Sequence, residues 1–179
     1  MEVPVVPLFN PPRNPKFLAA ICTRFITHLF EECQENESDI LQHKLKQFIS
    51  HVFEKMPALA EAVAFGALLL MQQVKHTHGL KLGVHEGAYG EPFATGHALF
   101  ITALIIAQKE VIKESVSHGF WSTTVSQGIL EESLLVAMER EVRESLEGKM
   151  TLDYETIVKF RRDVAYIHGM PVLLALARK

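Results

Sequence analysis

The stretches GHALFITALIIAQKE (residues 96–110) and LEESLLVAMEREVRESL (residues 130–146) decide the fold. The first is apolar or nearly so from residue 98 to 107 and polar in its last three residues, so we expect a buried helix with an open C-terminal turn. The second is amphipathic, because apolar residues recur every four positions along one side. Those residues are Leu130, Leu134, Met138 and Val142. Packing this stripe on the first helix brings Lys109 and Glu139 near one edge of the pair.

The rest of the chain also has helical spacing, and no segment alternates as a strand does. We expect further helices at residues 15–33, 40–54, 57–74, 120–126 and 153–169, and we expect the helix that starts at Gly96 to reach Lys113. The third of these is apolar nearly all round, which is typical of a central helix, and Pro57 suits its first turn. Residues 75–95 contain five glycines or prolines and predict a long loop. The sequence therefore predicts an all-α fold.

Composition limits the classes of protein that the chain can belong to. Its 179 residues are 48% hydrophobic and 22% charged, which suits one globular domain with a sizeable core. A formal net charge of −3 gives no general attraction to nucleic acid, and we expect no nucleic-acid partner. The longest apolar region, residues 58–71, is interrupted by Glu61 and is shorter than the roughly twenty residues of a membrane span. We therefore expect no membrane insertion.

The cysteines and the N-terminus indicate a reducing compartment. Cys22 and Cys33 lie eleven residues apart in one expected helix, hence about 16 Å apart along its axis, too far for a disulfide. Residues 1–15 contain five prolines and lack a basic start with a long apolar core, so they do not resemble a secretory signal. We expect an extended arm there and a cytoplasmic or nuclear protein.

The segments HALFITALIIAQKE and LEESLLVAMEREV, with the connection that carries Trp121, resemble the third, fourth and fifth helices of the cyclin box. The likeness is greatest to the short single-box cyclins of fungi, such as the phosphate-system cyclins. It implies a five-helix box over about residues 40–147, with an extra N-terminal helix and one or two short C-terminal helices. The implied organisation is an extended proline-rich arm (1–15), a cyclin-like domain with its preceding helix (16–149) and a C-terminal helical extension (150–179).

The resemblance also implies a function and a site. In cyclins a lysine that ends the third helix and a glutamate within the fifth grip the kinase, and these positions fall on Lys109 and Glu139. Val142, Arg143 and Val111 would surround that contact. The implied function is a non-catalytic regulatory subunit that binds and activates a cyclin-dependent protein kinase, with no cofactor and no bound metal.

Two other functions remain open. The same fold can be a scaffold that binds peptides or transcription components without a kinase. A metal-binding helical domain is the other alternative, since His76, His78 and His85 lie close together in sequence. Zinc needs three or four ligands, however, and no Cys-x-x-Cys or His-Glu-x-x-His pattern accompanies them.

Other residues with reactive side chains fit ordinary structural roles. Lys109 and Glu139 could be two surface charges that contribute at most about 1 kcal/mol to the fold. Neither Cys22 nor Ser126 lies in a recognised nucleophile turn. Carboxylate pairs at helix ends, Glu110 with Glu114 and Glu131 with Glu132, are typical of solvated groups. We therefore expect no enzyme.

Overall fold

A computed structural model describes residues 10, 12, 14–30, 38–78 and 95–171 of the chain. All regular elements among them are helical, so the all-α prediction is confirmed for this part of the chain. In chain order they are α1 (Pro15–Phe30), α2 (Ser38–Lys55), α3 (Glu61–His78), α4 (Thr95–Val111), α5 (His118–Phe120), the π-helical turn η2 (Trp121–Val125), α6 (Glu132–Ser145), α7 (Tyr154–Val164) and the π-helical turn η3 (Ala165–Gly169). Most of the expected proline-rich arm, Cys33, the loop around His85 and the last eight residues lie outside the description.

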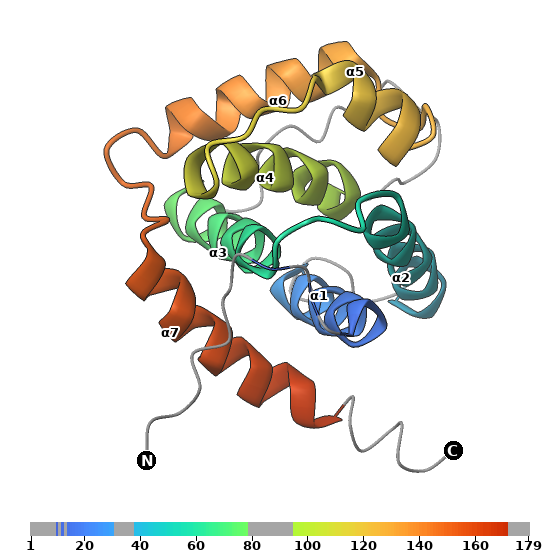
Figure 1. The fold of residues 1–179 in the computed structure, drawn as a ribbon, viewed down its shortest axis with the longest axis vertical. Coiled ribbons are helices and arrows are strands. Elements are labelled where there is room, and N and C mark those ends of the chain that lie inside the picture. Colours follow the sequence, from blue (N-terminus) through green and yellow to red (C-terminus); the bar gives the residue numbers. More distant parts are fainter. Residues whose placement is uncertain (1–9, 11, 13, 31–37, 79–94, 172–179) are drawn as a thin grey trace.

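Helices α3 and α4 form the centre of the molecule, as Figure 1 shows. Helix α6 covers one side of α4, whereas α7 lies on the opposite side against α3. Helix α1 packs on α3, and α2 packs on α1 and also reaches α4 and η2. Gly66 of α3 allows the close approach of α4, since a Cβ atom there would lie 3.4 Å from the Cβ of Ala107. The nearly all-apolar sequences of α3 and α4 thus correspond to helices that are covered on most sides.

The start of α3 differs from the expectation. We expected the helix to begin at Pro57, but Pro57 lies in a turn closed by a hydrogen bond from Leu59 N to Met56 O (3.0 Å), and α3 begins at Glu61. The backbone N–H of Glu61 donates instead to the carbonyl of Asn10 (2.9 Å). A tertiary contact therefore takes the hydrogen bond that an earlier helical turn would have used.

The connection between α4 and α6 is compact. Helix α4 ends at Val111, not at Lys113, because Lys113 adopts a left-handed conformation with φ +58°. Trp121 of η2 is fully buried, and the nearby hydroxyls bond the backbone: Ser122 Oγ donates to Leu130 O (2.6 Å) and Ser126 Oγ to Ser122 O (2.7 Å). These bonds replace part of a regular helical ladder and fix the chain where it enters α6.

Helix α7 shares the core of the preceding helices. Asp153 caps it as expected, since its Oδ1 accepts a hydrogen bond from Thr156 N (2.9 Å). Ile157 and Val164 are buried, and Arg161 Nε donates to Glu61 Oε1 of α3 (2.8 Å). The described part of the expected C-terminal extension is therefore packed on the domain.

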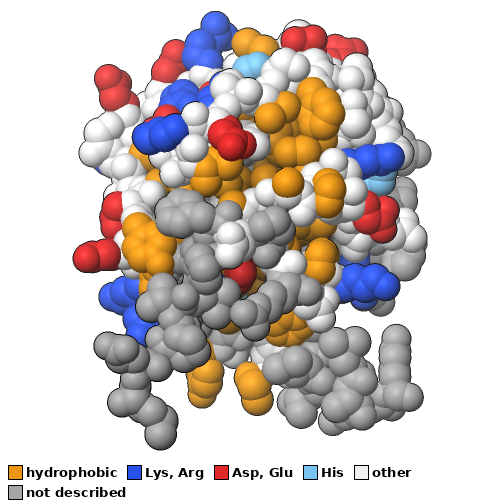
Figure 2. Space-filling view, in the orientation of Figure 1, with side chains coloured by type: hydrophobic (Ala, Val, Ile, Leu, Met, Phe, Trp, Pro, Cys, Tyr) orange, Lys and Arg blue, Asp and Glu red, His pale blue; other side chains and the backbone are white. Residues whose placement is uncertain are grey.

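Most large apolar side chains of the described residues are buried, and a few are exposed. On the face drawn in Figure 2, apolar side chains form patches with charged side chains around them. The exposed large apolar residues are Val136, Tyr154, Tyr166, Ile167 and Met170. Tyr166 and Ile167 lie within η3 and Met170 directly follows it, whereas Val136 lies on α6 one turn before Glu139.

Candidate functional site: the Glu139 cluster

Lys109 and Glu139 meet across α4 and α6. The buried residues Leu135, Met138 and Val142 hold α6 on α4, which places Glu139 at the margin of the contact beside the last turn of α4. The Nζ atom of Lys109 lies 2.8 Å from each carboxylate oxygen of Glu139. The edge position predicted for these two residues from helical spacing is therefore present in the structure.

Two further side chains, those of His118 and Arg143, complete the surroundings of Glu139. His118 Nε2 of α5 lies 2.6 Å from Glu139 Oε2, and Arg143 Nε donates to Glu139 Oε1 at 3.1 Å. Arg143 also uses Nη1 to donate to Glu110 Oε1 at 2.7 Å. We call these five residues the Glu139 cluster: Lys109, Glu110, His118, Glu139 and Arg143. It joins α4, α5 and α6 through charge-assisted hydrogen bonds.

The cluster keeps Glu139 ionised. Burial by itself would raise the pKa of the Glu139 carboxyl, but hydrogen bonds from Lys109, His118 and Arg143, with the charge of Lys109, hold it below its ordinary value. An ionised carboxylate can only accept hydrogen bonds, so His118 must carry a hydrogen on Nε2. The pKa of Arg143 is raised, because its bonds to Glu110 and Glu139 outweigh partial burial. The site is thus one shielded anion held among cations.

The five residues predicted for the partner contact differ in exposure. The side chains of Lys109 and Arg143 are 26% and 33% exposed, whereas that of Glu139 is 10% exposed. Val111, at the end of α4, is partly buried against the core. Val142 does not fit the expected contact, because it is only 2% exposed and packs in the core as part of the α6 stripe. The accessible groups are therefore Lys109 and Arg143, with Glu139 behind them.

Sequence reasoning missed His118, and it considered Glu110 only as a solvated carboxylate paired with Glu114. His118 precedes the short helix that we expected to begin at Phe120, and the three-residue α5 has no period from which a side-chain direction could be inferred. Glu110 could have been predicted as a member of the cluster, since it follows Lys109 at the polar end of α4, where its carboxylate can meet a cation on α6.

The other candidate residues that the structure describes do not assemble into a site. Among the residues that the structure describes, no group of three or more His, Cys, Asp or Glu side chains is placed to hold a metal ion. His76 is exposed on α3, and His85 and the side chain of His78 lie outside the description. Burial strongly raises the pKa of the Cys22 thiol, which therefore stays protonated, and Ser126 is buried with its hydroxyl bonded to the backbone.

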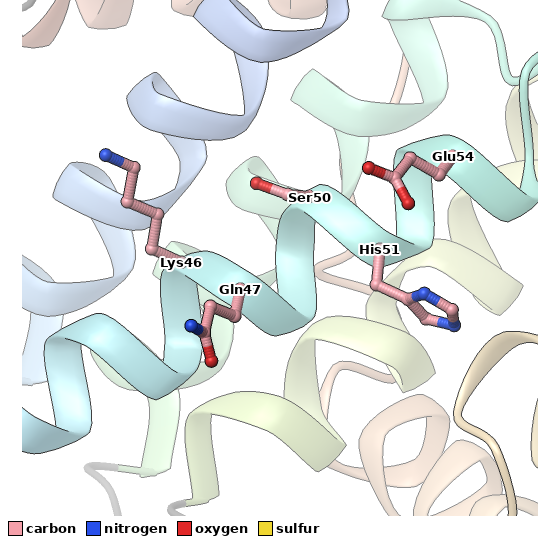
Figure 3. Close-up of a pocket in the computed structure, with 5 residues that line it drawn as sticks. All are labelled: Lys46, Gln47, Ser50, His51 and Glu54. Carbon is pink, nitrogen blue, oxygen red and sulfur yellow. The ribbon is translucent and has the colours of Figure 1, made fainter.

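A hollow of about 320 Å³ lies along the polar side of α2. Its lining residues are Lys46, Gln47, Ser50, His51 and Glu54. Figure 3 shows that they do not converge: the side chains of Ser50 and Glu54 point to one side of the helix, and those of Gln47 and His51 to the other. This arrangement has no common point at which a ligand would meet several polar groups.

Comparisons of the chain with known protein families, with characterised proteins and with solved structures give no match. No helix of the described residues combines the length and the apolar character that crossing a membrane requires.

Proposed function

We propose that the chain is a non-catalytic regulatory subunit that binds and activates a cyclin-dependent protein kinase, of the kind that pairs with the phosphate-system cyclins of fungi. The proposal rests on the resemblance of residues 97–110 and 130–142 to the cyclin box. The observation that supports it most is the contact of Lys109 Nζ with both Glu139 oxygens at 2.8 Å. In the resembled family these two positions form one binding unit, and here their side chains lie within one cluster.

The chemistry of the cluster suits recognition of a partner's backbone. Lys109 and Arg143 are partly exposed donors at the ends of packed helices, so little side-chain freedom is lost when a partner carbonyl accepts from them. Glu139 fixes both cations from behind. A partner loop or helix end with free carbonyl groups would bind there without any requirement for particular side chains.

Activation would then be mechanical. Docking would hold the kinase's mobile helix in the position where its glutamate pairs with the lysine of the ATP site, which completes the site for phosphoryl transfer. The chain itself would bind no ATP and transfer no phosphate.

The test is binding of the kinase that co-purifies with the chain from its native cell. We expect Lys109→Ala and Glu139→Ala each to abolish binding while the far-ultraviolet circular dichroism keeps its helical signal. Lys149→Ala and Glu147→Ala are matched controls, since both residues are exposed and lie outside the cluster, and they should bind normally. Unchanged binding in both cluster variants, or the absence of any co-purifying kinase, would reject the proposal.

A further inference from the structure

His118 contacts Glu139 from a third element, which carries none of the residues assigned to the kinase contact. Helix α5 is short, but it is fixed: Ser117 Oγ accepts from Phe120 N at 3.2 Å. Gly119 lies so close to α6 that an added Cβ would be 3.3 Å from Glu132 Oε2. The histidine is thus presented to Glu139 from a backbone that rests directly on α6.

The contact distinguishes one carboxylate oxygen from the other. Lys109 bonds both oxygens of Glu139, and Arg143 Nε bonds Oε1. Oε2 receives His118 Nε2 at 2.6 Å, the shortest hydrogen bond described for Glu139. The last torsion of a glutamate side chain is broad and roughly two-fold, so without His118 the carboxylate could turn toward Arg143. The Lys109 ammonium, which is bonded to both oxygens of this carboxylate, would move with it.

We infer that His118 is a positioning residue, which orients the Glu139 carboxylate and thereby holds the Lys109 ammonium where it meets the kinase. This inference rests on the proposed function, because the benefit of the orientation lies in binding. The imidazole bonds Glu139, with the cations Lys109 and Arg143 beyond that carboxylate, and Glu132 lies against the neighbouring Gly119.

Two substitutions separate positioning from packing. His118→Phe keeps a ring of similar size without a donor, and His118→Gln places an amide N–H near the position of Nε2. We expect His118→Phe to weaken kinase binding about 5- to 10-fold, the effect of one lost hydrogen bond, and His118→Gln to restore most of the affinity. His76→Phe, at an exposed histidine of α3, is the matched control and should bind normally.

The second measurement needs no kinase. Carbon-13 NMR of the Glu139 carboxyl in the full chain should show its pKa rise toward the ordinary glutamate value in His118→Phe and fall again in His118→Gln, because His118 is one of the donors that lower it.

The two measurements give distinguishable results. An unchanged Glu139 titration in His118→Phe overturns the inference whether or not a kinase binds. A shifted titration with unchanged kinase affinity overturns the positioning role in binding. A shifted titration together with a wild-type chain that binds no kinase rejects the proposed function, and it supports His118 as the group that orients Glu139 in the free protein.

Discussion

Glu139 and His168 are both shielded ionisable side chains, but their surroundings are opposite. Glu139 is bonded by Lys109, His118 and Arg143. His168 of η3 lies against α1, with its ring centroid 5.6 Å from Phe25 and 5.9 Å from His28. Its pKa is lowered, first by burial and then by His28 and Arg24. Burial favours the neutral form of each group, so the neighbours decide the outcome: cations oppose burial at Glu139 and reinforce it at His168.

The difference teaches what each region can do. The Glu139 cluster holds several charges together near the surface, which is the arrangement that a polar partner can recognise. The contact between α1 and η3 disfavours a charge on His168 and is mainly packing, since Phe25 also meets Phe160 of α7 edge to face at 5.6 Å. Partner binding should therefore depend on the first region. The change in folding stability between neutral and mildly acidic pH should depend on the second.

The largest effect is expected from neutralising Glu139. Glu139→Gln leaves Lys109 and Arg143 beside an uncharged amide, and we expect it to lower the free energy of unfolding at pH 7 by about 2 kcal/mol, less than for a fully buried ion pair. Urea unfolding measures this change. Glu144→Gln, an exposed residue of the same helix, is the control and should change stability by less than about 0.5 kcal/mol.

The same variant has a defined pH dependence. Because the folded pKa of Glu139 is lowered, the carboxylate's contribution is complete above the unfolded value near 4.5 and is lost as pH falls through the folded pKa. The difference between wild type and Glu139→Gln should therefore shrink in acid. A difference that stays constant from pH 7 to pH 3 would contradict the electrostatic account of the cluster.

A smaller effect is expected at Arg143, which is one-third exposed and bridges Glu139 and Glu110. Arg143→Met keeps the apolar stem and should cost about 0.5 to 1 kcal/mol at low salt, since exposed ion pairs are weak. The cost should decrease in 1 M NaCl, where the screening length is about 3 Å. Arg140→Met, at an exposed arginine of the same helix, should show neither effect, and equal losses in the two variants would contradict the bridge.

The smallest effect is expected from the titration of His168. Its folded pKa lies below the unfolded value of 6.5, so the unfolded chain binds the proton more readily. The stability that depends on neutral His168 is complete above pH 6.5 and is lost as pH falls through the folded pKa. Thermal unfolding between pH 7.5 and 5 should show this decline in wild type and in His76→Phe, and a weaker decline in His168→Phe. Parallel pH curves for all three proteins would contradict it.

Much of the helical framework could be predicted from residue spacing. The four-residue stripe of α6 and the polar end of α4 predicted that Lys109 and Glu139 would lie at one edge, and Asp153 predicted the start of α7. Helical spacing also predicted that Val142 is part of the apolar stripe of α6, and the structure buries it there. The cyclin resemblance implied instead that Val142 lies beside the partner contact. The kinase partner itself came from that resemblance and stays a proposal.

The remainder depends on contacts between distant segments. The start of α3 is set by a hydrogen bond from Glu61 to Asn10, which no local pattern reveals. The position of His118 follows from how α5 and η2 fit against α6, and a three-residue helix is too short for periodicity to orient its side chains.

The two serine hydroxyls at the entry to α6 have a consequence for covalent modification. Ser122 and Ser126 are buried, and each hydroxyl is bonded to a backbone carbonyl, so neither can receive a phosphate group in the native chain. Ser133, a few residues further on, is exposed, so its hydroxyl is accessible to phosphorylation. A phosphate found on Ser122 or Ser126 would therefore mark molecules that had lost this turn before they were modified.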